Sequence, residues 1–368
     1  MAKGNKSVLK TIIKVVVSIV LVIVLVAIGY FAYIMIDYSR IEDDLKITPQ
    51  GTMTKTSVSL GTKYTVVTQN LGFGAYTPDF TFFMDGGTES WAASKESVIK
   101  CIGDGADNVK TFNPDFILFQ EVDIDSTRSY HVDQSELLAT AFEGYMYTEA
   151  VNYHSSFLMY PLTQPHGSSN SEIMTFSSVK IEDGIRRSFP ISEGFSKFLD
   201  LDRCFSKSYV ATENGKFLVL YNVHSSAYGG SDEIRTAQMT KLFEDMQKEY
   251  DAGNYCVCGG DFNHDFTGDS KKVLNPDMDI RDDYGWAQAF PADLLSNYDI
   301  TQCISYSDEK LQPTCRDCDI PYVEGNFTVV VDGFLISKNV ECVDVWNRYN
   351  GFTYSDHAPV QLDFILKA

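Results

Sequence analysis

The amino-acid sequence predicts an α/β domain of two packed β-sheets covered by helices, preceded by one N-terminal transmembrane helix. Three observations lead to this prediction: an uncharged run near the N-terminus, about nine strand-like segments after it, and a few helix-like segments interleaved with the strands. Of the 368 residues, 44% are hydrophobic and 13% aromatic, which is enough for a large core. This composition excludes a disordered chain and a small disulfide-stabilised scaffold.

The first predicted element is a transmembrane helix over residues 15–36, which read VVVSIVLVIVLVAIGYFAYIMI without a charge. A helix of this length crosses a hydrocarbon core of about 30 Å and satisfies its own backbone hydrogen bonds. Four lysines precede the run and four acidic residues follow it, at positions 3, 6, 10 and 14 and at positions 37, 42, 43 and 44. We therefore expect a single-pass protein of the cell membrane, with its N-terminus in the cytoplasm and its body outside.

A cleaved signal peptide is the alternative interpretation of the same run. Signal peptides carry an apolar stretch of about 7 to 15 residues and then a small-residue cleavage site. The run here is longer, and no clear site of that kind follows it. The sequence therefore favours an uncleaved signal anchor, with residues 1–14 as a basic cytoplasmic stub.

Residues 37–61 are polar and rich in Ser and Thr, which predicts a linker, and residues 62–368 form the predicted globular domain. Helical spacing of apolar residues predicts helices over residues 90–103, 135–142 and 232–250. Segments rich in β-branched and aromatic residues predict strands over residues 64–70, 115–122, 171–181, 206–212, 216–226, 254–262, 328–337, 339–346 and 358–366.

The charge is distributed unevenly along the chain. The formal net charge is −20, and because residues 1–36 hold four Lys and no acid, the remainder carries 26 basic and 50 acidic residues, a charge of −24. So acidic a body cannot collect nucleic acid on a general basic surface, which excludes a protein that coats DNA. A polyanionic substrate would have to be held by a local cationic or metal-bearing site.

The sequence leaves the chemical state of the cysteines open. Cys315 and Cys318 have the spacing of a zinc half-site, but no second C-x-x-C and no nearby His accompany them, so zinc is disfavoured. Disulfides outside the membrane and plain thiols both stay open for the eight cysteines, because their connectivity cannot be read from sequence.

Acidic, amide and imidazole side chains stand at the ends of six predicted strands. Any one of them could be a helix cap or a turn residue, but six strand ends of this kind together favour a shared cleft. The residues are Asn70, Glu121, His224, Asp261, Asn263, Asp332, Asp356 and His357.

This residue set has the chemistry that hydrolysis of a phosphate ester requires. Glu121 and further carboxylate or amide oxygens can hold Mg²⁺, a hard cation that takes few protein ligands. Two histidines can bind phosphoryl oxygens or move protons near neutral pH. A strand-end Asp can orient a water molecule, and a neighbouring Asn can donate to the charge that develops at phosphorus.

The motifs TQNLG, FQEVD, SEIMTFSS, LYNVHSSA, GGDFNHD, VDGFLIS and SDHAPV follow one another between Asn70 and Val360. In this order they resemble the endonuclease/exonuclease/phosphatase superfamily, which includes deoxyribonuclease I, apurinic endonucleases, neutral sphingomyelinases and inositol polyphosphate phosphatases. The resemblance implies a four-layer α/β/β/α sandwich like that of deoxyribonuclease I, with residues 62–368 as the catalytic domain.

The resemblance also implies a metal site. Glu121 would be the principal ligand of Mg²⁺ or Mn²⁺, and Asn70 and Asp356 would complete or support the site. Whether one or two ions bind is not decided by the motifs.

Catalytic roles are implied in the same way. Asp261 would orient the attacking water, Asn263 and His224 would contact the scissile phosphate, and His357 would be the second histidine, with its tautomer fixed by Asp332. Glu172 lies where some family members have an acid paired with the other histidine. Arg203 and Arg316 are candidates for contacting the substrate.

The sequence thus predicts a membrane-anchored, extracellular, metal-dependent phosphoesterase that cleaves phosphodiesters by water attack. Nucleic acid is slightly favoured as the substrate. A phospholipid headgroup or an inositol phosphate is the first alternative, and a catalytically silent surface-binding module is the second. No protein partner is evident from the sequence, so the expected partners are the phosphate-ester substrate and the membrane.

Overall fold

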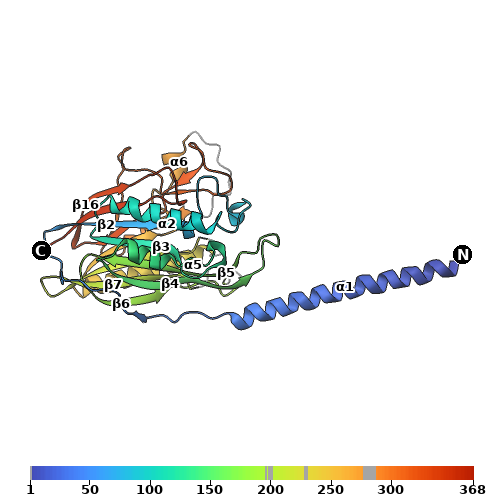
Figure 1. Ribbon diagram of the computed structural model, residues 1–368. Helices are drawn as coiled ribbons and strands as arrows, with labels where there is room; N and C mark the ends of the chain where they lie inside the picture. Colours follow the sequence, from blue (N-terminus) through green and yellow to red (C-terminus); the bar gives the residue numbers. More distant parts are fainter. Residues whose placement is uncertain (1, 195–196, 198–201, 228–230, 277–286) are drawn as a thin grey trace. The chain divides into compact units, whose positions relative to one another are not determined.

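The computed structural model describes residues 2–194, 197, 202–227, 231–276 and 287–368, and the chain divides into the units Met1–Arg40 and Ile41–Ala368 (Figure 1). The first unit is mainly helix α1 (Ala2–Asp37), and its side chains from residue 8 to residue 29 are exposed. By length and composition, the stretch Val8–Asp37 is able to span a membrane. The apolar helix predicted over residues 15–36 is therefore confirmed as a helix.

The second unit contains two mixed sheets. The first sheet has the strand order β1 (Leu45–Ile47), β6 (Ile181–Ser188), β7 (Cys204–Ala211), β8 (Phe217–His224), β9 (Tyr255–Asp261), β15 (Asp332–Ser337), β12 (Ile300–Cys303). The second has the order β16 (Val340–Asn347), β17 (Val360–Leu366), β2 (Lys63–Asn70), β3 (Phe116–Asp123), β5 (Gly167–Ser177), β4 (Met146–Leu158). Two small ribbons pair β10 (His264–Asp265) with β11 (Gln288–Ala289) and β13 (Cys315–Arg316) with β14 (Thr328–Val329).

Alternating side chains along the central strands explain how the layers pack. In β3, Phe116 and Leu118 face the other sheet and pack with Leu220 of β8, whereas Ile117 and Phe119 face outward. Successive side chains of a strand point to opposite faces, so a strand that is apolar at every position must be covered on both faces. The predicted sandwich of two sheets between helical layers is confirmed.

Three helices supply most of the outer covering. They are α2 (Lys95–Lys110) and α3 (Gln134–Ala141) on the second sheet and α5 (Asp232–Asp251) on the first. Each begins at a side chain that accepts a hydrogen bond from a backbone N–H in the first turn, namely Ser94, Asp133 and Ser231. The Ser94 cap explains why α2 begins at residue 95 and not at the predicted residue 90.

Shorter helices complete the described part of the second unit. They are α6 (Ser270–Leu274), α7 (Ala292–Leu295) and the 3₁₀ turns η1 (Gly72–Gly74), η2 (Phe83–Asp85) and η3 (Thr127–Ser129).

Strand direction determines where the sheets deliver their polar ends. β2 and β3 run parallel, and so do β8 and β9, so the carboxyl ends of each pair lie at one edge. β15 and β17 run antiparallel to β9 and β2, so their first residues lie at that same edge. One edge of the sandwich therefore collects residues from both halves of the chain.

Most of the predicted linker over residues 37–61 packs against the second unit, whose boundary falls at residue 41. Leu45–Ile47 forms strand β1 on the free edge of β6, and Val58 is fully buried in the core between the sheets. Asp43 accepts hydrogen bonds from the Ser188 backbone N–H (2.9 Å) and the Lys241 ammonium (2.6 Å). Only residues 38–40 separate helix α1 from this unit.

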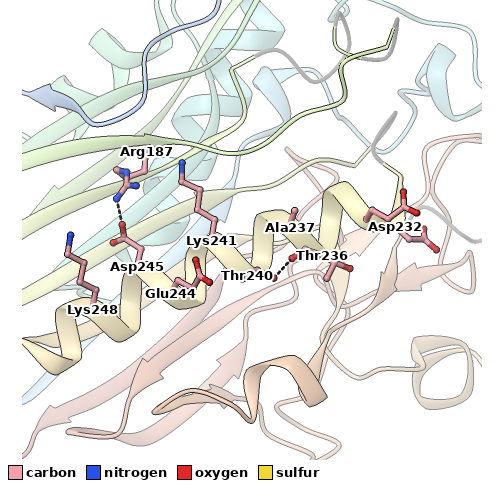
Figure 2. A pocket seen from close by; sticks show the side chains of 10 residues that line it. Arg187, Asp232, Thr236, Ala237, Thr240, Lys241, Glu244, Asp245 and Lys248 are labelled. Carbon is pink, nitrogen blue, oxygen red and sulfur yellow. Dashed lines mark hydrogen bonds and ion pairs between the residues drawn. The ribbon is translucent and has the colours of Figure 1, made fainter.

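A hollow runs along the outer face of α5, as Figure 2 shows. Arg187 pairs with Asp245 and Asp43 there, and Lys241 pairs with Asp43. Arg187 and Lys241 therefore hold the segment that follows α1 against this face.

Gly260 is required where β8 and β9 pair. A Cβ at this position would lie 2.0 Å from the Val223 carbonyl oxygen, and its φ is +149°. We expect Gly260→Ala to lower the free energy of unfolding by about 3 kcal/mol, because the two strands would have to separate. Chemical denaturation of the purified chain measures this loss.

Gly103→Ala is the matched control. Gly103 lies within α2 with open space around its Cβ position. This change should raise the free energy of unfolding by up to about 1 kcal/mol. Equal stability of the two variants would contradict the role given to Gly260.

Candidate active site

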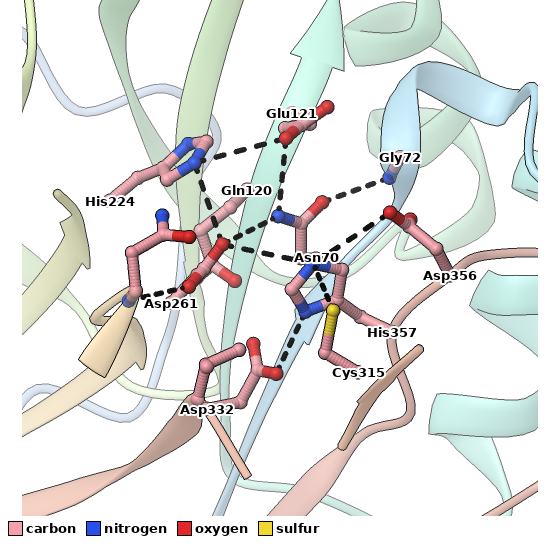
Figure 3. A network of polar contacts seen from close by, with 12 residues as sticks. Asn70, Gly72, Gln120, Glu121, His224, Asp261, Cys315, Asp332, Asp356 and His357 are labelled. Carbon is pink, nitrogen blue, oxygen red and sulfur yellow. Dashed lines mark hydrogen bonds and ion pairs between the residues drawn. The ribbon is translucent and has the colours of Figure 1, made fainter. Parts of the chain in front are cut away.

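The eight strand-end residues singled out from the sequence lie together at the shared edge of the two sheets (Figure 3). Backbone register brings three of them side by side, because Asp261 of β9 stands opposite both His224 of β8 and Asp332 of β15. Asn70 and Glu121 come from the parallel pair in the other sheet. The site is thus built across the gap between the sheets.

Asp261 Oδ2 is the centre of the polar contacts. It accepts a hydrogen bond from Asn70 Nδ2 at 3.0 Å and lies 3.5 Å from His224 Nε2 and 3.8 Å from His357 Nε2. Its other oxygen accepts the Asn263 backbone N–H at 2.9 Å. The carboxylate is 2% exposed, so its position is set by protein atoms on every side.

Glu121 owes its position to a bulge in β3. Regular pairing with β5 breaks between Phe119 and Val122, and Glu121 has a φ of +54°. A β-bulge redirects a side chain. A positive φ is rare for a residue other than glycine. Here the bulge leaves the Glu121 carboxylate 24% exposed, 3.8 Å from His224 Nε2 and 3.4 Å from Asn70 Nδ2.

His357 is held by a carboxylate behind it. Its Nδ1 lies 2.8 Å from Asp332 Oδ2, and its Nε2 is 3.5 Å from Cys315 Sγ and 4.0 Å from Asp356 Oδ2. This pairing fixes the orientation of the ring, so that Nε2 points into the site. Cys315, for which the sequence left a disulfide and a plain thiol open and disfavoured zinc, is buried beside the ring as a free thiol.

The two histidines are in opposite electrostatic environments. Burial, followed by the Arg203 guanidinium, lowers the pKa of His224 well below its usual value. Burial alone would also lower the pKa of His357, but Asp332 and the neighbouring Cys315 and Asp356 raise it well above. The site therefore presents one neutral and one protonated imidazole around a single carboxylate.

The buried carboxyl groups of the site are harder to ionise than free ones. Burial, together with Asp332, raises the pKa of Asp261 to about 6. Burial, together with the Glu121 charge, raises the pKa of Asp356. Desolvation is the largest cause in both cases, and the charge of a neighbouring carboxylate adds to it.

The residues present fit a hard divalent cation. Glu121, Asp356 and the Asn70 side chain supply the oxygen ligands that Mg²⁺ and Mn²⁺ take. Space beside the carboxylate is kept by Gly72, where a Cβ would lie 2.6 Å from Asp356 Oδ1. Asp332 Oδ1 is a buried oxygen without a hydrogen-bond partner in the described part of the chain. Asp261, Asp332 and His357 also form a compact group that could hold a metal ion.

Residues 68–357 match the model of the endonuclease/exonuclease/phosphatase family. The chain belongs to the endonuclease/exonuclease/phosphatase family. The match spans every residue of the cluster at the sheet edge. None of the curated proteins compared with this chain matches it.

Solved structures of this family share the fold. An endonuclease/exonuclease/phosphatase from Beutenbergia cavernae is 17% identical, with a TM-score of 0.54 over 83% of this chain and 72% of its own. ANGEL2, a 2′,3′-cyclic phosphatase, is 12% identical, with a TM-score of 0.53 over 88% and 99% of the two chains. A family member from Bacteroides vulgatus is 13% identical, with a TM-score of 0.51 over 83% and 100%.

Arg203 lies in the site, as the sequence analysis expected of a candidate contact. Its Nη1 is 2.7 Å from His224 Nε2 and donates to Asn152 Oδ1 at 3.3 Å. Asn152 in turn donates to the His224 carbonyl oxygen at 3.3 Å. Asn152 was missed, because it lies within an edge strand and no motif marks it.

Glu172 and Arg316 face elsewhere. Glu172 alternates with Met174 and Phe176, which pack under the outer helices, so its side chain leaves β5 on the face opposite the other sheet. Burial, and then Glu149 and Asp133, raise the pKa of Glu172 to about 8. Its expected pairing with the other histidine is wrong, because the described partners of His224 are Arg203, Glu121 and Asp261.

The Arg316 guanidinium is 1% exposed and hydrogen-bonded to main-chain carbonyl oxygens. Its Nη2 donates to the carbonyl oxygens of Thr77 (3.0 Å) and Phe80 (3.2 Å). Its backbone N–H donates to the Asp356 carbonyl oxygen at 3.0 Å. Arg316 therefore supports the loop that carries Asp356, and its guanidinium is engaged by main-chain carbonyl oxygens.

A second buried arginine lies near the site and was missed. Arg128 forms a two-pronged ion pair with Asp123 (2.9 and 3.0 Å) and stacks 3.9 Å from the Phe73 ring centre. Its charge contributes to the low pKa of His224. No sequence pattern distinguishes it from an exposed arginine, because its burial comes from tertiary packing.

A prediction about pH follows from Asp261. If hydrolysis needs the Asp261 carboxylate, kcat/KM should reach a plateau near pH 7 and fall tenfold per pH unit below a midpoint no higher than about 6. The sign follows from protonation, because acid converts the anion to the neutral acid. Initial rates on a soluble phosphodiester at saturating metal give the profile, and a midpoint above pH 7 would contradict it.

Proposed function

We propose that this protein is a membrane-anchored, divalent-metal-dependent hydrolase of phosphodiesters. The observation that carries the proposal is the position of the Asp261 carboxylate, 3.5 Å from His224 Nε2 and 3.8 Å from His357 Nε2, with Glu121 and Asp356 beside these rings. Hydrolysis of a phosphate ester needs a group that receives a proton, donors for phosphoryl oxygens and a centre that neutralises charge. The cluster contains one candidate for each need.

The division of work among the side chains follows from their surroundings. Asp261 orients the attacking water and takes its proton, because it is the central carboxylate and its pKa is raised to about 6. His357, kept protonated by Asp332, donates to a phosphoryl oxygen. His224 and Asn263 contact the same phosphate from the β8 and β9 side. Arg203, next to His224, is the nearest side-chain cation that can share this task.

Mg²⁺ or Mn²⁺ is the proposed cofactor. Glu121, with support from Asn70 and Asp356, would hold the ion. When bound, the ion supplies charge neutralisation for the phosphoryl group. Mutation of residues that only support a metal ligand typically costs 10- to 100-fold in metal affinity, so loss of a direct carboxylate ligand should cost at least as much.

A metal titration of Glu121→Gln tests this assignment. We expect the metal concentration for half-maximal activity to rise by about 10-fold or more, while the variant keeps the fold. Asp107→Asn, which changes an exposed carboxylate of α2, is the control and should leave the titration unchanged. Equal metal dependence of Glu121→Gln and the parent would remove Glu121 from the metal site.

The central experiment compares Asp261→Asn with Asp265→Asn. Both carboxylates are 2% exposed, but Asp265 accepts hydrogen bonds from Thr267 and Ser270 in a turn. The full-length chain in detergent, with Mg²⁺ or Mn²⁺, should cleave bis(4-nitrophenyl) phosphate in a chelator-sensitive reaction. Asp261→Asn should lower kcat by about 10²- to 10⁴-fold, whereas Asp265→Asn should lower mainly stability. Absence of any turnover by the parent would overturn the proposal.

We propose α1 as a signal anchor that holds residues 41–368 at the outer face of the cell membrane. Its uncharged run and the lysines before it support this orientation. The protein should stay in the membrane pellet after alkaline carbonate extraction, and protease added to intact cells should digest the C-terminal unit. A soluble, shortened product would support signal-peptide cleavage instead.

Nucleic acid and lipid phosphodiesters both suit the chemistry of the site. The acidic body weakens the case for nucleic acid, because the described cations near the site, Arg203 and Arg128, are bound to protein groups. The exposed apolar hairpin between β4 and β5 favours a lipid substrate.

A further inference from the structure

The hairpin between β4 and β5 presents apolar side chains to solvent. Residues 157–162, here called the tip, include Phe157, Met159, Tyr160 and Leu162, which are 40%, 42%, 70% and 80% exposed. The hairpin, drawn in green, projects from the second unit (Figure 1). Neighbouring exposed apolar side chains of this size mark an interaction site in a folded protein.

The tip also lies in a stretch that lacks charge. Residues 150–171 contain no Asp, Glu, Lys or Arg, although these types make up 22% of the chain. A formal charge would oppose entry into the acyl boundary of a bilayer, whereas Tyr and Leu are suited to it. The absence of basic residues argues equally against a nucleic acid as the occupant of this surface.

Strand β4 connects the tip to the candidate active site. Asn152 of β4 hydrogen-bonds to the His224 carbonyl oxygen and to the Arg203 guanidinium. From Asn152 the strand continues to Leu158, so Phe157 lies about 17 Å further along at 3.3 Å per residue. The tip therefore extends beyond the site at the same end of the unit.

The segment that arrives from α1 reaches the same end. Asp202 accepts the backbone N–H of Ile41 at 2.8 Å, and its other oxygen lies 3.5 Å from Nδ1 of His154 on β4. Asp202 also precedes Arg203, which contacts His224. Asp202 thus links Ile41, strand β4 and the candidate active site. Only residues 38–40 separate Ile41 from α1.

We propose that the 157–162 tip docks into the bilayer that α1 spans, and that the substrate is the phosphodiester of a zwitterionic lipid headgroup presented at that surface. This inference rests on the proposed function. The charge of −24 on residues 37–368 opposes an anionic surface, which selects a zwitterionic one. Because only residues 38–40 separate the unit from α1, a small apolar contact with the bilayer is enough to orient the unit.

Docking is tested without catalysis. The full-length chain carrying Tyr160→Trp is reconstituted in phosphatidylcholine–sphingomyelin vesicles, with and without brominated acyl chains. We expect the added indole fluorescence, measured against the parent, to be quenched. Val343→Trp is the control, because Val343 is 45% exposed on β16, at the opposite edge of the same sheet from β4. Equal quenching of the two variants would overturn docking by the tip.

Substrate presentation is tested in the same vesicles with a Tyr160→Asp/Leu162→Asp double variant. Release of phosphocholine should fall by about 10-fold or more, while hydrolysis of soluble bis(4-nitrophenyl) phosphate should stay within about twofold of the parent. Val343→Asp should change neither rate. Lipid cleavage that is insensitive to the double variant would overturn the inference.

Two further outcomes separate the inference from the proposed function. Cleavage of an oligonucleotide and of the soluble diester, with no lipid cleavage, would overturn the lipid substrate and leave the proposed function standing. Absence of turnover on all three substrates would overturn both the proposed function and the lipid substrate, whereas quenching of the Tyr160→Trp indole would still support docking.

Discussion

The site depends on two parallel strand pairs that end at one edge of a sandwich. β2 and β3 in one sheet and β8 and β9 in the other are buried on both faces, so their register is fixed by packing. Directly beneath the site, Gln120 of β3 donates to the Asn222 side chain of β8 at 2.7 Å, and Asn222 donates to the Phe119 and Met174 carbonyl oxygens. These buried amides are satisfied only when the sheets are aligned, which places Asn70 and Glu121 opposite His224 and Asp261.

The charges around the two site histidines explain their opposite pKa shifts. The cluster gathers Asp261, Asp332 and Asp356 around His357, whose protonated form they stabilise. His224 lies on the side of Arg203 and is held neutral. A buried site with excess negative charge is unfavourable by itself, and a bound divalent cation would relieve it, so metal binding and stability are expected to be linked.

The segment after α1 belongs to the domain and is more than a tether. β1 covers the free edge of β6, and Asp43 joins that edge to α5 through Ser188 and Lys241. A covered edge cannot pair with another chain. The same segment begins at Ile41, whose backbone N–H donates to Asp202, next to Arg203. The segment that follows α1 and the candidate site therefore share contacts.

The sequence by itself determined the apolar helix, the sandwich class and the eight strand-end residues, because hydrophobic period and strand-end chemistry are local patterns. It did not reveal β4 or β6, whose alternation is interrupted by bulges, nor the packing of residues 41–61, which are polar yet paired. Only the tertiary structure decided the directions of Glu172 and Arg316. A side chain's face depends on register and on which neighbours bury it, as with Glu172 among outward-facing residues and Arg316 among loop carbonyls. For the same reason Asn152 and Arg128 became visible only once the two sheets were packed together.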